Sequence, residues 1–444
     1  QFVRVTADPG VTVERVEAVP VHTDVAEAGR FVCSNDVVNR LQDISRASLL
    51  NNFHSIPTDC PHREKQGWTA DTYMTDQAAI YNFDMAAFYA KWVEDLAGTQ
   101  DSAGGLCTVA PSTGYDQSIS PVWPAAIVYV PWDLLAYYGD RRVVERHYET
   151  MMRFAESSLL RQRDGKPEII GEVLGDWVSP HMTLSDTLMS YSMAPPEGLT
   201  LYGTASHYRV VRNLAEVARF LGKRDDAVRL DAWADRIARR FNEEFFDAAS
   251  GIYHGENPTP YRQAANVVPL EYGLVPEADS ARVLGSLLRD LDGTRDRIGT
   301  GFVGTLSMME LMPRIDPERA YRLATQPDYP GWGFMALSGA TTMWETWDGS
   351  ASRNHPPFCL ISAYFYKYLA GIRCDRAYPG FERFTVDPSV VGDLTFVEAW
   401  HDSPYGRIRS EWRRDGSRLT MKVSVPVGTT ATIGVPTRDA AGVA

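Results

Sequence analysis

The chain has 444 residues, a net charge of −13 and an apolar share of 44%. This length suits two or three domains, or one large one. The acidic balance argues against a polyanionic partner such as nucleic acid or an anionic membrane surface. No apolar run is long enough to predict a membrane-spanning helix.

The five cysteines are far apart in the sequence and include no CxxC pair. We therefore expect neither a disulfide framework nor a zinc site. Buried free cysteines usually behave as small hydrophobic residues, and that is the interpretation we adopt for Cys33, Cys60, Cys107, Cys359 and Cys374.

Residues 1–30 alternate apolar and polar side chains around a Pro9-Gly10 turn, which is typical of β-strands. The chain opens in the middle of this pattern, so we expect these residues to be linker strands or the end of an N-terminal β domain. The period becomes helical at "CSNDVVNRLQDISRASLLNNF", where Ser34 or Asn35 is the expected N-cap.

Helical patterns then fill the region from 31 to 375. The segment "PVWPAAIVYVPWDLLAYYG" is apolar nearly all round, which predicts a helix buried on every side. The segment "DDAVRLDAWADRIARRFNEEFF" has one apolar face, made by Leu230, Trp233, Ala234, Ile237, Phe241 and Phe245. About twelve helices with loops of alternating length indicate a mainly α toroid of inner and outer helices. Its functional loops should gather at one end.

Strand-like alternation returns after Gly380, with turn signals at Tyr405-Gly406 and Asp415-Gly416. We expect residues 376–444 to form a C-terminal β-sandwich beside the helical domain of residues 31–375.

The connection "SIPTDCPHREKQGWTADTY" concentrates charged and aromatic side chains between two helical segments. Two prolines stiffen it, and Arg63 lies between Asp59 and Glu64. An Arg lowers the pKa of a neighbouring carboxyl and an aromatic wall raises it, so such a loop can separate a proton donor from ionised carboxylates. A salt-bridged cluster that caps a helix gives the same pattern, and the loop alone leaves both interpretations open.

A second loop, "TTMWETWDGSASRNHPPF", places Glu345 between Trp344 and Trp347, with His355 close behind. Indole faces suit the apolar faces of sugar rings, although a core Trp pair with an exposed Glu is the alternative. Trp123 and Trp177 add aromatic side chains in other loops. An acid from each end of the helical region could form the carboxyl pair that glycosidic bond cleavage requires.

Other chemistries find less support in the sequence. The nine histidines show no HExxH or similar ligand spacing, and no GxSxG elbow, Walker A motif or GxGxxG unit is present. Cys60 lacks an electropositive setting beyond Arg63, so we do not expect it to act as a nucleophile.

"PTDCPHREKQGWTAD" and "SGATTMWETWDGSASRNHPPF" resemble the two signature loops of the inverting bacterial α-L-rhamnosidases of glycoside hydrolase family 78. Further similarity at "FVCSNDVVNRL", "FYKYLAGI" and "VEAWHDSPYGRIRSEWRR" extends the resemblance over essentially the whole chain. It implies an (α/α)6 catalytic toroid at 31–375, a C-terminal β-sandwich, and a rhamnosylated carbohydrate as substrate. It implies neither a metal nor an organic cofactor.

Position by position, the resemblance implies that Glu64 is the general acid and that Glu345 is the general base that activates water. It also implies a set of sugar-binding and pocket-lining residues: Asp59, Arg63, Trp68, Asp71, Trp123, Asp176, Trp177, Trp344 and His355. In an inverting enzyme, the two carboxyl groups would stand about 6.5–9.5 Å apart.

The chain departs from the family pattern at three positions. Ala70 replaces a usual Gly, Thr72 replaces a usual Ala, and Thr346 stands where an Arg often follows the base. These changes keep open a toroid glycosidase with another sugar preference. Two separate alternatives are a lyase acting on an acidic sugar, for which no Tyr/His pair stands out, and a carbohydrate-binding relative without turnover. The pattern is compatible with a cytoplasmic or a secreted enzyme and with any oligomeric state. Both carboxylates of the proposed pair are retained, which favours an enzyme.

Overall fold

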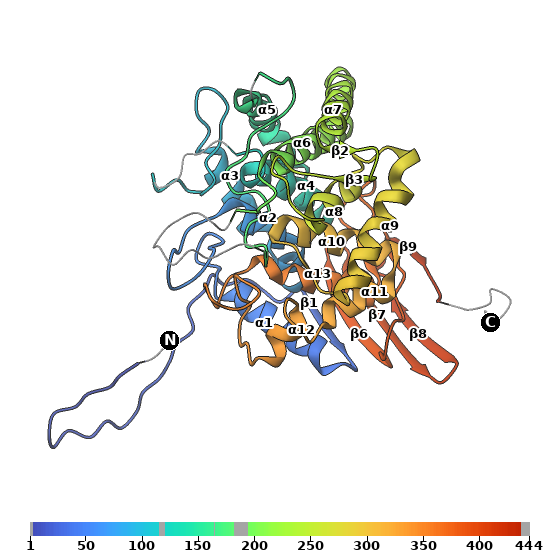
Figure 1. Ribbon diagram of the computed structural model, residues 1–444. Coiled ribbons are helices and arrows are strands. Elements are labelled where there is room, and N and C mark those ends of the chain that lie inside the picture. Colours follow the sequence, from blue (N-terminus) through green and yellow to red (C-terminus); the bar gives the residue numbers. More distant parts are fainter. Residues whose placement is uncertain (1–2, 115–119, 164, 182–193, 437–444) are drawn as a thin grey trace.

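Figure 1 shows the computed structural model, which describes residues 3–114, 120–163, 165–181 and 194–436. Thirteen α-helices lie within these residues: α1 (Asp36–Leu50), α2 (Thr69–Asn82), α3 (Ala86–Ala97), α4 (Ala126–Tyr138), α5 (Arg141–Ser157), α6 (Thr200–Phe220), α7 (Arg224–Phe245), α8 (Gln263–Tyr272), α9 (Glu277–Thr294), α10 (Phe302–Ile315), α11 (Pro317–Thr325), α12 (Trp332–Leu337) and α13 (Ile361–Tyr364). A π-helical turn, Phe365–Leu369, continues α13.

Six of these helices form a closed inner ring. α2 packs on α4, α4 on α6, α6 on α8, α8 on α10, α10 on α13, and α13 returns to α2. The ring helices are apolar on most sides; in α4 every residue from Ala126 to Tyr137 is buried, as its sequence predicted. The outer helices are amphipathic, and the predicted apolar face of α7 is the face it buries. The chain is therefore a toroid of six helical hairpins, which confirms the (α/α)6 fold.

The start of α1 shows how a local signal sets a boundary. Asn35 is its N-cap, and the side-chain oxygen of Asn35 accepts hydrogen bonds from the amides of Val37 and Val38. Asn at this position satisfies amides that have no partner within the helix. Of the two expected caps, Asn35 is the one used.

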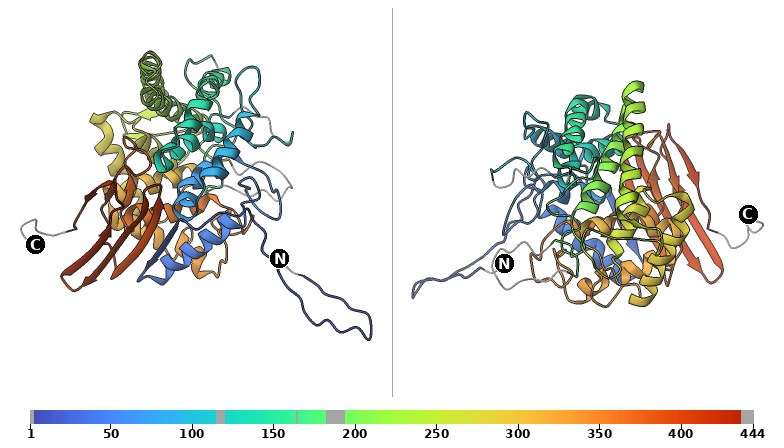
Figure 2. Two further views of the ribbon diagram at one scale, coloured as in Figure 1. Left: turned by 180° about the vertical axis from the view of Figure 1, so that it is seen from behind. Right: turned by 45° about the horizontal axis from the view of Figure 1, so that its top comes forward.

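Two sheets lie beside the toroid, and Figure 2 shows them along one side of it. The larger has the order β1-β6-β7-β8, formed by β1 (Gly29–Cys33), β6 (Phe396–Ser403), β7 (Gly406–Asp415) and β8 (Arg418–Ser424). The smaller has the order β4-β5-β9, formed by β4 (Ile372–Cys374), β5 (Arg383–Val386) and β9 (Thr430–Ile433). A short hairpin, β2 (Phe246–Asp247) with β3 (Ile252–Tyr253), follows α7.

The larger sheet joins both ends of the chain. β1 pairs antiparallel with β6, so that Arg30 lies opposite Trp400 and Cys33 opposite Val397. On β7, Trp412 Nε1 donates to the carbonyl of Leu369 at 2.9 Å and Ser410 Oγ donates to that of Ala370 at 2.6 Å. These bonds attach the sheet to the end of the inner ring.

The strands expected within residues 1–30 are present only as β1. Residues 3–22 form an extended arm with a turn at Pro9-Gly10, visible at the N-terminal end in Figure 1. Seven of its valines are exposed: Val3, Val5, Val11, Val13, Val16, Val19 and Val21. Alternation favours a strand, but a strand also needs a neighbour for its backbone hydrogen bonds. Within the described part of this region, Gly29–Cys33 pairs with β6 and Glu27 forms an isolated bridge with Phe83, whereas residues 3–22 pair with no strand. No helix among the described residues has the length and apolar character needed to cross a membrane.

Candidate active site

The first predicted loop lies between α1 and α2 and is held by its own backbone. The amide of Asp59 donates to the carbonyl of Gln66 at 2.9 Å, and the amide of Gln66 donates to Asp59 Oδ1 at 2.8 Å. Asp71 lies in the first turn of α2. This closed loop fixes the directions of the side chains between residues 59 and 71.

The second predicted loop lies between α12 and α13. Its turn is closed by the amide of Glu345, which donates to the carbonyl of Ser352 at 2.8 Å, and by the amide of Ser352, which donates to Glu345 Oε2 at 3.0 Å. The amide of His355 donates to the carbonyl of Met343 at 2.9 Å. The amide of Met343 in turn donates to Ser48 Oγ on α1, which attaches the loop to this outer helix.

The two loops meet at Arg63, 282 positions before Glu345 in the chain. One guanidinium nitrogen of Arg63 lies 2.6 Å from Glu64 Oε1 and 3.1 Å from Glu345 Oε2. Trp68 Nε1 donates to the other oxygen of Glu64 at 2.8 Å. Among the described residues, Glu345 Oε1 accepts no hydrogen bond, because both donors to this carboxylate use Oε2.

His355 joins the remaining carboxylates of the first loop. Its Nε2 lies 3.0 Å from Asp71 Oδ1, and its Nδ1 lies 4.0 Å from Asp59 Oδ2 and 3.9 Å from Glu345 Oε2. Asp59, Asp71 and His355 are all buried. The structure thus brings seven of the predicted site residues together: Asp59, Arg63, Glu64, Trp68, Asp71, Glu345 and His355.

Burial and the crowding of charges change the protonation of this cluster. Burial raises the pKa of Asp59 to about 9, and the nearby Asp71 carboxyl adds to the effect. The pKa of Asp71 is also raised by burial. Burial alone would lower the pKa of His355, but the Glu345 and Asp71 carboxylates raise it well above its usual value. The site therefore combines a protonated imidazole with a carboxyl group that stays neutral near pH 7.

Asp59→Asn is expected to flatten the loss of stability as the pH rises. The pKa of Asp59 is 3.8 when solvated and about 9 in the folded protein, so between these values only the folded state keeps the proton. Stability then falls as the pH increases through that window. An Asn side chain does not ionise, so melting temperatures measured across the window should decline less steeply in the variant.

The control is Asp225→Asn, on the exposed first turn of α7. It should leave the pH slope of the melting temperature unchanged. Parallel curves for the wild-type protein and Asp59→Asn would contradict the assignment of a neutral carboxyl group to Asp59.

The other four predicted residues occupy separate positions. Trp123 is buried at the start of a short 3-10 turn before α4. Trp344 is also buried, and the guanidinium of Arg353 lies 5.2 Å from the centre of its ring. Asp176 and Trp177 lie beside the N-terminus of α10, where the carbonyl of Trp177 accepts the amide of Phe302 at 2.9 Å.

Asp176 caps a helix of the inner ring. Its Oδ2 accepts the amide of Gly301 at 2.7 Å and its Oδ1 accepts the amide of Gly304 at 2.8 Å. Burial raises the pKa of Asp176 to about 7, against the effect of these two amides, which favour the ionised form. Since both oxygens are used, the geometry gives this carboxyl group a structural role at the start of α10.

Asp176→Ala is therefore expected to lower the free energy of unfolding by about 2 kcal/mol, because it leaves two buried amides without an acceptor. Urea denaturation measures the loss. A variant of unchanged stability with a raised KM for substrate would instead favour the sugar contact that the family resemblance implies.

Three contributors to the site were not predicted. Phe302, the first residue of α10, stacks on His355 with ring centres 6.0 Å apart and planes inclined by 23°. The Ser352 amide orients Glu345, and Cys60 Sγ accepts the amide of Glu64 at 3.2 Å. No motif marks Phe302 or Ser352, because each acts through a stacking or backbone contact. For Cys60, the sequence predicted a small buried hydrophobic residue and no nucleophilic role.

One group among the described residues has the composition of a metal site. A carboxylate oxygen of Asp59, the sulfur of Cys60 and a ring nitrogen of His355 lie within 4.8 Å of one another. The contacts with His355 and Asp59, and the amides of Glu64 and Lys65, lower the pKa of Cys60 to about 6, although burial alone would raise it.

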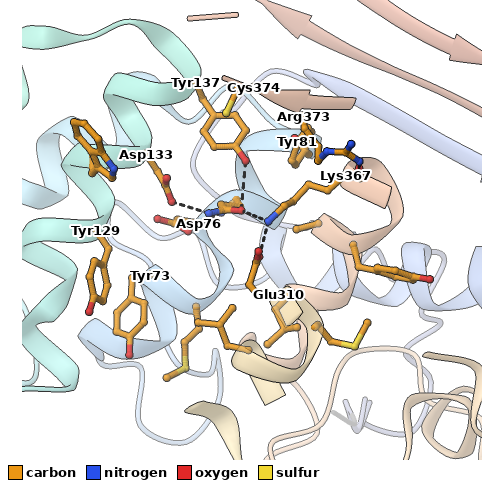
Figure 3. A pocket seen from close by; sticks show the side chains of 18 of the residues that line it. Tyr73, Asp76, Tyr81, Tyr129, Asp133, Tyr137, Glu310, Lys367, Arg373 and Cys374 are labelled. Atoms are coloured by element: carbon orange, nitrogen blue, oxygen red, sulfur yellow. Dashed lines mark hydrogen bonds and ion pairs between the residues drawn. The ribbon is translucent and has the colours of Figure 1, made fainter. Parts of the chain in front are cut away.

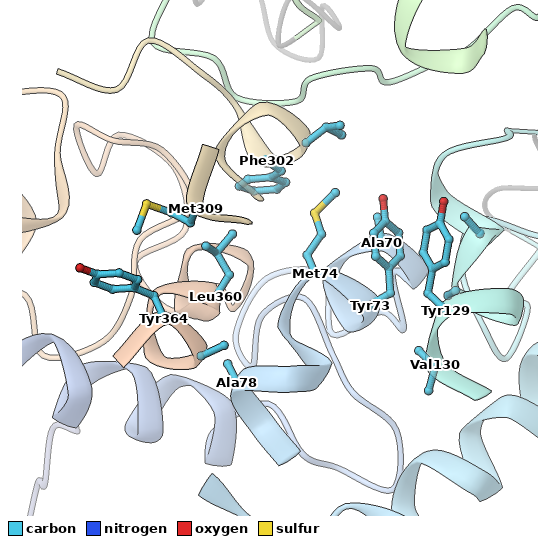
Figure 4. Packing of buried hydrophobic residues seen from close by; sticks show 14 of the residues in the cluster. Ala70, Tyr73, Met74, Ala78, Tyr129, Val130, Phe302, Met309, Leu360 and Tyr364 are labelled. Atoms are coloured by element: carbon cyan, nitrogen blue, oxygen red, sulfur yellow. The ribbon is translucent and has the colours of Figure 1, made fainter. Parts of the chain in front are cut away.

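A polar cavity of about 350 Å³ lies elsewhere on the toroid axis (Figure 3). Each helix of the inner ring or the turn after it contributes to its wall, including Tyr73, Tyr129, Arg209, Glu271, Glu310 and Lys367. None of the predicted site residues lines this cavity. Figure 4 shows the apolar cluster next to it, in which Met74 and Leu360 belong to the cavity wall and Phe302 is the residue that stacks on His355.

Comparison with known proteins gives consistent results. Residues 26–369 match the family described as the bacterial alpha-L-rhamnosidase 6 hairpin glycosidase domain, and residues 371–444 match the bacterial alpha-L-rhamnosidase C-terminal domain. A curated alpha-L-rhamnosidase from Formosa agariphila is 29% identical over 441 residues, which cover 95% of this chain and 45% of that protein.

Solved structures agree with this result. An alpha-L-rhamnosidase from Dictyoglumus thermophilum superposes with a TM-score of 0.87 at 32% identity, over 97% of this chain and 48% of that one. The Streptomyces avermitilis alpha-L-rhamnosidase complexed with L-rhamnose superposes with a TM-score of 0.82 at 27% identity, over 94% of this chain and 40% of that one. The chain thus spans about half the length of the relatives it matches.

Proposed function

Because this chain belongs to the family of bacterial alpha-L-rhamnosidases with a six-hairpin glycosidase domain, we propose that it hydrolyses terminal α-L-rhamnose from glycosides or oligosaccharides. The proposed mechanism is a single displacement that inverts the anomeric centre. The observation that carries the proposal is the meeting of Glu64 and Glu345 at Arg63, which joins carboxyl groups from opposite ends of the helical region.

In the proposed mechanism Glu64 donates a proton to the glycosidic oxygen. Its carboxyl group is partly exposed, with 31% of the side chain accessible, so it can reach a leaving group that extends toward solvent. Trp68 Nε1 holds Oε2 of Glu64 in place. Oε1, whose hydrogen-bond donor among the described residues is the half-exposed Arg63, is the oxygen from which we expect the proton to be delivered.

Glu345 is proposed to take a proton from the water that attacks the anomeric carbon. Its side chain is buried and its Oε2 is fixed by the amide of Ser352. Oε1 accepts no hydrogen bond from the described residues and is the atom available to water. A base needs this combination of fixed orientation and one free oxygen.

Arg63 has to move when substrate binds. A single nitrogen contacts Glu64 and Glu345, at 2.6 and 3.1 Å, so it occupies the space between the acid and the base. In an inverting enzyme a sugar carbon and a water fill that space, and the two carboxyl groups stand about 6.5–9.5 Å apart. With 47% of its side chain exposed, Arg63 can turn toward a sugar hydroxyl and release the pair.

Asp59, Asp71 and His355 are proposed to bind hydroxyls of the sugar. Oδ2 of Asp59 and Nδ1 of His355 are buried and make no hydrogen bond with the described residues, while Oδ1 of Asp71 lies 3.0 Å from Nε2 of His355. Unpaired buried polar atoms cost about 1–3 kcal/mol each, which a ligand hydroxyl would recover. Trp68, and beyond it Trp123, Trp177 and Trp344, are the proposed aromatic walls of the pocket.

We further propose that residues 31–375 form the catalytic domain and 376–444 a β-sandwich domain, of which residues 437–444 lie outside the described part of the chain, with residues 1–30 as linker strands or the end of an N-terminal β domain. The bonds from Trp412 and Ser410 to the end of the inner ring support a fixed contact between the two domains.

The test is hydrolysis of p-nitrophenyl α-L-rhamnopyranoside beside a panel of other aryl glycosides. We expect the rhamnoside to be the preferred substrate. If another glycoside is preferred, the substrate specificity differs from that of the family, and Ala70, Thr72 and Thr346 are the residues to which we would attribute the difference. Affinity for L-rhamnose without turnover of any glycoside would indicate a carbohydrate-binding relative.

A further inference from the structure

We propose that Asp59, Cys60 and His355 bind a thiophilic divalent cation, Zn²⁺ or Cd²⁺, and that the bound cation prevents the sugar from binding. The binding of the cation stands on the geometry of these three residues alone. Its effect on sugar binding rests on the proposed function.

The three side chains offer the donor set that such cations prefer. One carboxylate oxygen, one sulfur and one imidazole nitrogen lie within 4.8 Å of one another, and all three residues are buried. Zn²⁺ binds Cys sulfur at about 2.3 Å and His nitrogen or carboxylate oxygen at about 2.0–2.2 Å. An ion placed among these atoms therefore needs only a small contraction of the cluster. Sulfur among the ligands selects Zn²⁺ or Cd²⁺ over Mg²⁺ and Ca²⁺.

A second observation comes from unpaired polar atoms. Oδ2 of Asp59 and Nδ1 of His355 face each other at 4.0 Å, and both are buried without a hydrogen-bond partner among the described residues. The first of these residues is fully buried and the second 4% exposed. These two atoms, which lack a hydrogen-bond partner, and the adjacent sulfur together form a site that can bind a ligand.

The surrounding charge favours a cation. The carboxyl groups of Asp71 and Glu345 lie 3.0 and 3.9 Å from ring nitrogens of His355, and Arg63 contacts Glu345 from the side of Glu64. Each carboxylate within a few ångströms stabilises a divalent ion, and more so in a buried site. On binding, the proton of the Asp59 carboxyl group, the proton at Nδ1 of His355 and any proton still on the Cys60 sulfur leave to solvent, so that all three atoms present lone pairs to the metal.

The cation and the sugar would compete for the same atoms. Asp59 and His355 are proposed to bind sugar hydroxyls, and neither Oδ2 nor Nδ1 can serve a metal and a hydroxyl together. The inhibition should therefore be competitive, raising the apparent KM for the rhamnoside while kcat stays unchanged.

The experiment titrates the full chain with Cd²⁺ and follows the ultraviolet charge-transfer absorption of a cadmium–thiolate bond. The variants are Cys60→Ser and Cys60→Ala, with Cys107→Ser as the control. Cys107 is another buried free cysteine, and no metal-binding group among the described residues includes it. Thermal unfolding without metal identifies any variant that fails to fold.

In the wild-type protein and in Cys107→Ser, we expect an absorption band that saturates at one equivalent of Cd²⁺. Neither Cys60 variant should show this band. The inhibition constant for Cd²⁺ should rise at least about tenfold when Cys60 is replaced, since loss of a supporting residue at a metal site already costs 10–100-fold. An absent band in the wild-type protein, or an equal band in the folded Cys60 variants, would overturn the proposal.

Adding L-rhamnose separates the cation site from the proposed function. Weaker Cd²⁺ binding in the presence of L-rhamnose would support a shared site. A Cys60-dependent band that rhamnose leaves unchanged would retain the cation site and overturn its overlap with the sugar site.

Discussion

Replacing Glu345 by Gln is expected to lower kcat about 10²–10⁴-fold on every α-L-rhamnoside, because the amide cannot take a proton from the attacking water. The substitution preserves shape and keeps an oxygen for the Ser352 amide, which contacts Oε2 at 3.0 Å in the wild-type protein. Stability should therefore change little. Rates on an aryl and an alkyl rhamnoside should fall by similar factors.

Glu64→Gln should behave differently on the two substrates. A nitrophenolate leaves without much help from an acid, whereas an alkoxide needs its proton. The loss should therefore be larger for the alkyl rhamnoside than for p-nitrophenyl α-L-rhamnopyranoside. This difference between the variants separates the acid from the base, which a loss of rate alone does not.

The matched control is Asp348→Asn, an exposed carboxyl group three positions after Glu345 in the same loop. Its Oδ1 accepts hydrogen bonds from the amide and the hydroxyl of Ser350 and contacts neither Glu64 nor Glu345 in any described interaction, so its replacement should leave kcat near the wild-type value. Near-normal rates for Glu64→Gln and Glu345→Gln would remove both proposed roles.

Lys367→Met is expected to lower the free energy of unfolding by about 1–3 kcal/mol, because it removes the ammonium partner of Glu310, a carboxylate of the inner ring whose side chain is only 24% exposed. Lys367 Nζ lies 2.5 Å from Glu310 Oε1 and 3.0 Å from Gln77 Oε1, and the three residues line the axial cavity in Figure 3. Burial would raise the pKa of Glu310, but the Lys367 ammonium holds it below its usual value. Urea denaturation measures the change.

A control variant and a double variant test whether the loss of stability comes from the unpaired charge. Lys91→Met removes a lysine from the exposed pair with Asp95 and should cost less than about 1 kcal/mol. Adding Glu310→Gln to Lys367→Met should recover much of the loss, since no charge is then left unpaired. Equal effects of Lys367→Met and Lys91→Met would contradict the account of a buried ion pair.

The helices could be predicted from the sequence because their patterns reflect burial. α4 is apolar all round and lies in the inner ring, whereas the single apolar stripe of α7 faces inward from the outer ring. The same kind of pattern did not predict the structure of the arm formed by residues 3–22. Its alternation is compatible with strands, but a strand depends on a partner that the pattern does not encode.

The candidate site divides in a similar way. The loops around Glu64 and Glu345 could be identified from their composition, and the structure brings them together. The bridging position of Arg63 and the stacking of Phe302 on His355 depend on how distant segments approach one another. For Asp176, the family resemblance implied a place in the sugar pocket. In the structure both oxygens of its carboxyl group instead accept amides at the start of α10.

Inversion at the anomeric centre tests the central claim most directly. Proton NMR spectra recorded during the first moments of hydrolysis of an α-L-rhamnoside identify the anomer that the protein releases, before mutarotation mixes the two forms. A water activated by Glu345 on the face opposite Glu64 yields β-L-rhamnose first. Release of α-L-rhamnose first would show retention of configuration and would contradict the assignment of Glu345 as the base.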